Sequence, residues 1–224
     1  MIDLQKTARL AGLGYLLIFI TGIFSNFIVL EPLRIPDNIP GTLANFRENS
    51  ALLQWALFSF LLMVLLDALL SWFFFLLFEK TNRAFSLLAA WFRLLNSLLF
   101  AVALVWLFLA SRMAESPQDS PAETLFAAAL SGFDLTWLIG LIFFAIHLAL
   151  LAHLIIRSSA VPTVVGWLLG IAGLGYLVDS LAALLWPGYA ASAQIFSMMV
   201  IIPAVVGELT FTFFLLLKSR RFVS

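Results

Sequence analysis

Four ionisable side chains lie deep inside long apolar segments of this sequence. They are Asp67, Arg93, His147 and Glu208. A carboxylate can take up a proton, a histidine can carry a proton or ligate a metal, and an arginine can form a forked pair with a carboxylate. A lone arginine at mid-membrane costs about 2.5–3.5 kcal/mol on insertion scales. We therefore expect Arg93 to face a protein interior and to pair with Asp67 or Glu208.

The segments that must position these side chains are long enough to cross a bilayer. Of 224 residues, 63% are hydrophobic and 11% are charged, which is far outside the range of soluble domains. We predict an all-α integral membrane bundle, a single domain over residues 1–224. Because about 20 apolar residues span a bilayer, we predict six transmembrane helices, at 8–30, 51–78, 84–110, 133–156, 162–185 and 194–217.

The basic residues between these segments orient the bundle. Lys and Arg accumulate on the cytoplasmic side of membrane proteins. With the N-terminus inside, the inner segments hold eight basic residues, and the outer loops hold only Arg34, Arg47 and Arg112. We therefore expect both termini to be cytoplasmic and membrane lipids to surround the helices. The zero net charge gives no sign of nucleic-acid binding.

The two long outer loops are predicted to contain short surface helices. One begins at Thr42 and breaks near Asn49. The other begins with a capping box, in which Ser120 is the N-cap and Glu123 is at the third helical position, and it ends at Gly132. Asp134 would then cap the fourth transmembrane helix.

The four deep ionisable groups are predicted to share one layer. At 1.5 Å of rise per residue, each lies about 14–16 Å from the inner end of its helix. Asn96 lies one turn from Arg93 on the same face, which extends the polar surface. The candidate residues for binding a small ligand or a proton are Asp67, Arg93, Asn96, His147 and Glu208. The alternative is a static polar clamp that fixes how the helices pack.

Charge balance favours a proton in this layer. Arg93 with two carboxylates leaves one negative charge, so either a carboxyl or His147 must take up a proton. A proton on His147 would balance two positive charges against two negative ones. A divalent metal on Asp67, His147 and Glu208 would leave one excess positive charge, and a single deep histidine is unusual for zinc. We expect no metal and no other cofactor.

A second, smaller polar patch is predicted in the outer half of the bundle. It consists of Asn26, Tyr176 and Asp179. His153 follows His147 by six residues, which turns it to another face of the helix, so we expect it near the inner membrane surface.

The hexapeptide AGLGYL occurs twice, at residues 11–16 and 172–177. The flanking residues share no identity, so we do not interpret the repeat as an internal duplication. Small residues let helix backbones approach closely in lipid. We therefore interpret both copies as packing sequences.

Several blocks resemble a bacterial family of polytopic membrane proteins, domain of unknown function 4386. They include LLMVLLDALLSWFFFLLF, LLAAWFRLLNSLL, IGLIFFAIHLALLAHLIIRS and IIPAVVGELTFTFFLLLK. The resemblance implies a single domain in the bacterial inner membrane and no particular activity. Three functions stay open: binding or transport of a small ligand or proton, a structural or partner-binding scaffold, and a membrane-embedded metal hydrolase. We expect a non-enzymatic role, and the sequence is compatible with an oligomer.

Overall fold

The computed structural model describes residues 3–116 and 120–222. Nearly all of these residues are helical, and this part of the chain contains no strand. Within it, six helical stretches are long and apolar enough to cross a membrane, which confirms the predicted number. They are Leu4–Leu33, Ser50–Phe78, Arg83–Glu115, Ala122–Arg157, Thr163–Leu185 and Tyr189–Leu217.

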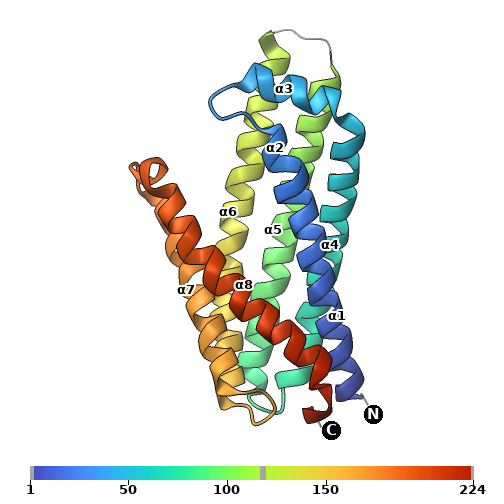
Figure 1. Ribbon diagram of the computed structural model, residues 1–224, viewed down its shortest axis with the longest axis vertical. Coiled ribbons are helices and arrows are strands. Elements are labelled where there is room, and N and C mark those ends of the chain that lie inside the picture. Colours follow the sequence, from blue (N-terminus) through green and yellow to red (C-terminus); the bar gives the residue numbers. More distant parts are fainter. Residues whose placement is uncertain (1–2, 117–119, 223–224) are drawn as a thin grey trace. The chain divides into compact units, whose positions relative to one another are not determined.

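The first stretch is built from three consecutive helical elements. They are α1 (Leu4–Gly22), the π-helix η1 (Ile23–Leu30) and the short α2 (Glu31–Leu33). The other long helices are α4 (Ser50–Phe78), α5 (Arg83–Glu115), α6 (Ser120–Arg157), α7 (Thr163–Leu185) and α8 (Ala193–Leu217) (Figure 1). Short 3-10 helices, η2 (Tyr189–Ser192) and η3 (Ser219–Arg221), precede and follow α8.

The first predicted surface helix is present as α3 (Ile39–Glu48), and it begins three residues earlier than expected. Asn38 is its N-cap, because the Asn38 side chain accepts a hydrogen bond from the Gly41 amide at 2.9 Å. Arg47 near its end donates to the carbonyl oxygens of Ala114 and Ser116, each at 2.7 Å. These bonds satisfy backbone acceptors at the end of α5.

The second predicted surface helix is wrong as a separate element. The helix that begins at Ser120 continues without a break to Arg157 as α6. Gly132 lies inside this helix and does not end it. A Cβ at this position would lie 2.6 Å from the Trp106 ring. The glycine instead lets α5 and α6 pack closely. The predicted capping side chain of Ser120 lies outside the described residues.

Asp134 is therefore in the middle of a helix and is not an N-cap. It forms a two-pronged ion pair with Arg34, with distances of 2.8 and 2.5 Å. Both side chains are partly exposed. The predicted cap requires a helix end at Gly132, and α6 has none there.

The chain separates into two compact units. The first unit holds residues 1–16, 66–97 and 138–224, and the second holds residues 17–65 and 98–137. Four long helices, α1, α4, α5 and α6, contribute residues to both units. The prediction of a single domain stays a prediction.

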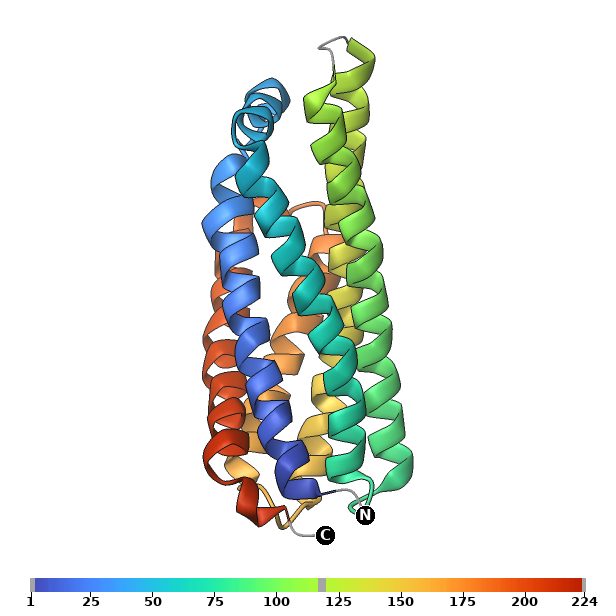
Figure 2. The same cartoon turned by 90° about the vertical axis from the view of Figure 1, so that its right-hand side faces the viewer.

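In the first unit, the described ends of the chain lie beside two interhelical turns. Leu4, Thr81, Ser158 and Phe222 line the same cavity, so α1 begins where the α4–α5 turn, the α6–α7 turn and η3 meet (Figures 1 and 2). Helices α7 and α8 pack along each other in the same unit. Gly207 permits their close approach, because a Cβ there would lie 3.1 Å from the Leu168 backbone. Pro203 lies within α8, and the helix continues through it.

Candidate functional site in the apolar interior

The core of the candidate site is a buried ion pair between α4 and α5. Arg93 Nη2 donates to Asp67 Oδ1 at 2.5 Å. The Arg93 side chain is 0% exposed and that of Asp67 is 7% exposed. The prediction that Arg93 pairs with a carboxylate is confirmed, and Asp67 is its direct partner. A buried pair depends on good geometry, because removing two charges from water is costly.

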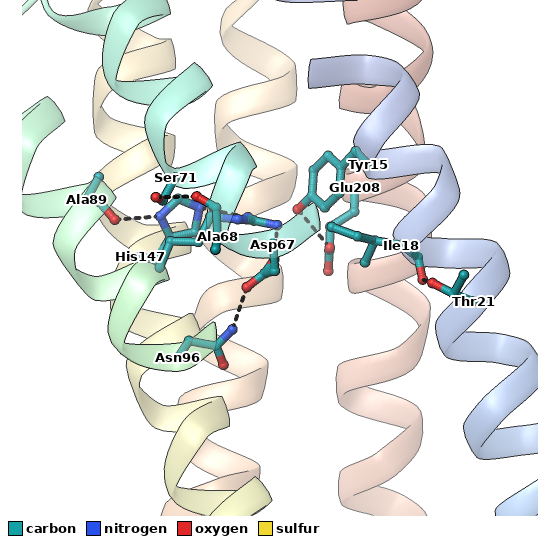
Figure 3. Close-up of polar contacts among 11 residues, drawn as sticks. Tyr15, Ile18, Thr21, Asp67, Ala68, Ser71, Ala89, Asn96, His147 and Glu208 are labelled. Carbon is teal, nitrogen blue, oxygen red and sulfur yellow. Dashed lines mark hydrogen bonds and ion pairs between the residues drawn. The ribbon is translucent and has the colours of Figure 1, made fainter. Parts of the chain in front are cut away.

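Asn96 completes the hydrogen bonding of the Asp67 carboxylate. Its amide nitrogen donates to Asp67 Oδ2 at 2.9 Å (Figure 3). Arg93 and Asn96 are three residues apart on α5 and therefore point the same way. The two oxygens of Asp67 thus each accept a bond from one face of α5, and both bonds favour the ionised form of the carboxylate.

His147 on α6 is the third polar member, and its two ring nitrogens have different partners. Nε2 lies 3.1 Å from Arg93 Nη1, and Nδ1 lies 2.9 Å from the carbonyl oxygen of Ala89. Arginine can only donate, so Nε2 must accept, and the carbonyl can only accept, so Nδ1 must carry the proton. His147 is therefore neutral. Of the two proton sites that the charge balance left open, a carboxyl is favoured over His147, because the guanidinium occupies the nitrogen that would take up the second proton.

The same contacts engage atoms that the alternative metal site at Asp67, His147 and Glu208 would need as ligands. Both nitrogens of His147 are occupied by protein partners, and Asp67 is committed to Arg93 and Asn96. Among the described residues, no three His, Cys, Asp or Glu side chains form a group that could hold a metal ion. These residues do not support the membrane-embedded metal hydrolase.

Three aromatic rings surround the guanidinium of Arg93. Its Cζ atom lies 4.9 Å from the centroid of Tyr15, 5.2 Å from that of Phe74 and 5.5 Å from that of Phe144. A cation over the face of an aromatic ring is stabilised by about 2 kcal/mol when it is desolvated. Phe74 and Phe144 also stack on His147, with centroids 6.1 and 6.0 Å away. We call Tyr15, Phe74 and Phe144 the aromatic cage.

The aromatic cage has no distinctive signal in the sequence. With 23 phenylalanines in the chain, the ring type carries no information about which rings face the arginine. Only helix phase could have indicated Phe74, which lies seven residues, or two turns, after Asp67.

Glu208 on α8 belongs to the same cluster but has a different environment. Its Oε2 accepts a hydrogen bond from the Tyr15 hydroxyl at 2.8 Å (Figure 3). Tyr176 on α7 lies close enough to interact with it as well. Glu208 is 6% exposed. In the described part of the chain, no basic side chain lies within ion-pair distance of it.

The repeated hexapeptide explains why two tyrosines reach Glu208. Tyr15 and Tyr176 are the fifth residues of the two AGLGYL copies. The glycines around them are packing positions, as predicted: a Cβ on Gly12 would lie 2.9 Å from Leu216, and one on Gly175 would lie 3.1 Å from the Met199 carbonyl oxygen. Each copy thus brings its helix against α8 and directs a phenol toward Glu208. The repeat is the sequence signal that points to Tyr15, which is not among the predicted site residues.

Two residues of the predicted outer patch, Tyr176 and Asp179, lie on α7. Asp179 accepts a hydrogen bond from the Tyr189 hydroxyl at 2.7 Å. Tyr176, one turn earlier on α7, interacts with Glu208 and Asp179. Asn26 belongs to the second unit and lies within the π-helix η1. Tyr189 is not among the residues predicted for this patch.

Some polar atoms of the site have no hydrogen-bond partner in the described structure. They are Arg93 Nε, Asn96 Oδ1 and Ser180 Oγ, all fully or almost fully buried. By contrast, Thr212 and Ser71 bond to carbonyls of their own helices. His153 is exposed and stacks on Phe85, with centroids 4.9 Å apart, as an interfacial histidine can.

The helices and the site together define a multi-pass α-helical membrane protein with a buried, aromatic-caged ion pair. Residues 10–219 match the family described as "Domain of unknown function (DUF4386)". The chain belongs to this family, as its sequence resemblance implied.

A relative and the solved structures complete the comparison. An "Uncharacterized protein" of Archaeoglobus fulgidus is 37% identical over 83 residues, which cover 37% of this chain and 46% of the relative. The chain therefore spans about half the length of this curated relative. No solved structure matches.

Proposed function

We propose that this protein binds a proton on Glu208 within the membrane and passes it between the two sides. The observation that carries the proposal is the unbalanced charge of the buried cluster. Asp67 and Arg93 neutralise each other, and His147 is neutral through its hydrogen bonds. Glu208 is then the one buried group of the layer whose charge has no direct partner in the described residues. A proton neutralises it without any other ligand.

The neighbours of Glu208 support a reversible proton site. Tyr15 donates to the carboxyl oxygen at 2.8 Å, and a carboxyl group can accept this bond in either protonation state. The Asp67–Arg93 pair presents charges of both signs to Glu208, so it stabilises neither state alone. Intramembrane carboxyl groups commonly form proton relays in pumps and transporters. The aromatic cage packs the cluster tightly, which favours a proton over a larger ligand.

Polar side chains continue from Glu208 along α7 and support a path for the proton. Tyr176 interacts with Glu208, and Asp179 lies one turn further along the same helix. The half-buried Tyr189 donates to Asp179 at 2.7 Å. Ser180, beside Asp179, has a buried hydroxyl without a partner, and such a group commonly binds an internal water. Together they form a series of exchangeable groups toward the α7–α8 connection.

The proposal predicts that Glu208→Gln abolishes proton flux. Purified protein would be reconstituted into liposomes containing a pH-sensitive dye, and flux would be driven by a potassium diffusion potential. Glutamine keeps the size of the side chain and can accept from Tyr15, but it cannot exchange a proton. Asp134→Asn, which removes an exposed carboxylate in the second unit, serves as the control and should retain flux. Equal flux through wild type and Glu208→Gln liposomes would refute the proposal.

We further propose a bacterial inner-membrane location with both termini in the cytoplasm. The support is the excess of basic residues, eight against three, at the end that carries the termini. Reporter fusions after Phe46, Asn82, Glu123 and Ser224 would test this orientation. We expect cytoplasmic signals at Asn82 and Ser224 and external signals at the other two. An external signal at Asn82 or Ser224 would reverse the assignment.

A further inference from the structure

A second polar site lies at the end of the first unit where the chain termini meet. It is a cavity of about 550 Å³ lined by residues from the α4–α5 turn, the α6–α7 turn and η3. Three basic and three hydroxyl side chains line it: Lys80, Arg157, Arg221, Thr81, Ser158 and Ser159. Its volume is within the range of small-molecule sites.

The charge of this cavity is unbalanced. The residues that line it include no acidic side chain. The ion pairs in the described part of the chain are Arg34–Asp134, Asp67–Arg93 and Arg112–Glu115, so none of them involves the cavity. Lys80 and Arg157 lie at the ends of α4 and α6, where cations interact favourably with the helix dipole. That role accounts for single residues, but not for three cations from three segments on one cavity.

The chemistry of the lining fits a phosphate group. Arginine pairs with phosphate oxygens through its planar fork, lysine adds a compact positive charge, and hydroxyl groups donate further bonds. Leu77 and Phe222 add apolar walls. Leu77 is also one residue before the end of a membrane-spanning helix, which places the cavity at the boundary between hydrocarbon and water. Basic pockets at this depth bind lipid headgroups.

We propose that this cavity binds a phosphate group, carried by the headgroup of an anionic phospholipid. Lys80, Arg157 and Arg221 hold the phosphate, while the apolar wall contacts the glycerol end of the lipid. The same cations could hold free phosphate, and the experiment separates the two sources. The site is independent of Glu208 and of proton binding.

Short-chain phosphatidylglycerol, phosphatidylcholine of the same chain length and inorganic phosphate would be titrated against protein in uncharged detergent. Thermal unfolding gives the dissociation constant for each, with sodium chloride matching the ionic strength. We expect binding of phosphatidylglycerol, and each of Lys80→Gln, Arg157→Gln and Arg221→Gln should weaken it about fivefold. Arg220→Gln is the matched control, since Arg220 is an exposed neighbour that does not line the cavity.

The controls decide both the site and the source of the phosphate. Melting temperatures without lipid would verify that each variant folds. Binding of inorganic phosphate with the same dependence on the three residues would support the phosphate site and overturn the lipid assignment. Equal weakening in Arg220→Gln, or equal stabilisation by phosphatidylcholine, would overturn the site, because the effect would then come from general charge or detergent replacement. Absence of phosphatidylglycerol and phosphate binding would also overturn it.

Discussion

Replacing Arg93 with alanine is expected to lower the free energy of unfolding by roughly 3–5 kcal/mol, the usual cost of breaking a buried ion pair. Arg93 and Asn96 both donate to the Asp67 carboxylate. The change leaves Asp67 with only the bond from Asn96. It also removes the cation from the aromatic cage and the donor from His147 Nε2. Reversible unfolding in mixed micelles would measure the loss.

Second-site changes distinguish a lost pair from a general packing defect. Asp67→Asn in the Arg93→Ala background removes the unpaired charge and should recover part of the loss. Arg112→Ala is the matched control, because its exposed pair with Glu115 should contribute little. Additive losses from Arg93→Ala and Asp67→Asn would contradict the observed contact.

The second large effect is expected from Phe74→Ala. Phe74 is 2% exposed. Its ring contacts the Arg93 guanidinium and stacks on His147. It also packs against the Tyr15 ring, with the two ring centroids 5.8 Å apart. Removing a buried phenylalanine side chain costs roughly 3–5 kcal/mol, since the cavity is only partly refilled. The same unfolding experiment would measure this loss.

Two further variants separate the ring from its volume. Phe74→Leu retains most of the apolar volume but removes the ring, so its residual loss reports the cation–π and stacking contacts. Phe108→Ala is a control on an exposed ring that lies 5.9 Å from Arg112, and it should have a small effect. If Phe74→Leu in the Arg93→Ala background costs as much as in wild type, the ring and the guanidinium are not coupled.

The membrane helices could be predicted because their signal is strong and local. Apolar runs longer than a bilayer require little knowledge of neighbouring segments. A helix break was predicted at Gly132, within α6, because a glycine in a sequence can mark either a helix terminus or a close packing position. The structure shows that Gly132 is a packing position, because a Cβ there would lie 2.6 Å from the Trp106 ring. Asp134 was misinterpreted as a direct consequence.

The candidate site was predictable in its membership and not in its hydrogen bonds. Matching depth identified Asp67, Arg93, His147 and Glu208, because a buried charge requires a partner at its own level. Depth alone cannot tell which nitrogen of His147 faces the arginine, and this contact determines that the histidine is neutral. Tyr15 was missed because an uncharged side chain within an apolar segment does not require an ionic partner, whereas the repeated AGLGYL sequence shows its importance only once both copies are seen beside α8.

Infrared spectroscopy of the protein in lipid tests most directly whether Glu208 carries the proton. A protonated carboxyl group has a carbonyl stretching band that an ionised carboxylate lacks, and the band shifts in heavy water. We expect wild type at neutral pH to show one such buried band, absent from Glu208→Gln and retained in Asp134→Asn, whose carboxylate lies in the second unit. A wild-type spectrum without the band, or a band that survives Glu208→Gln, would contradict the assignment of the proton to Glu208.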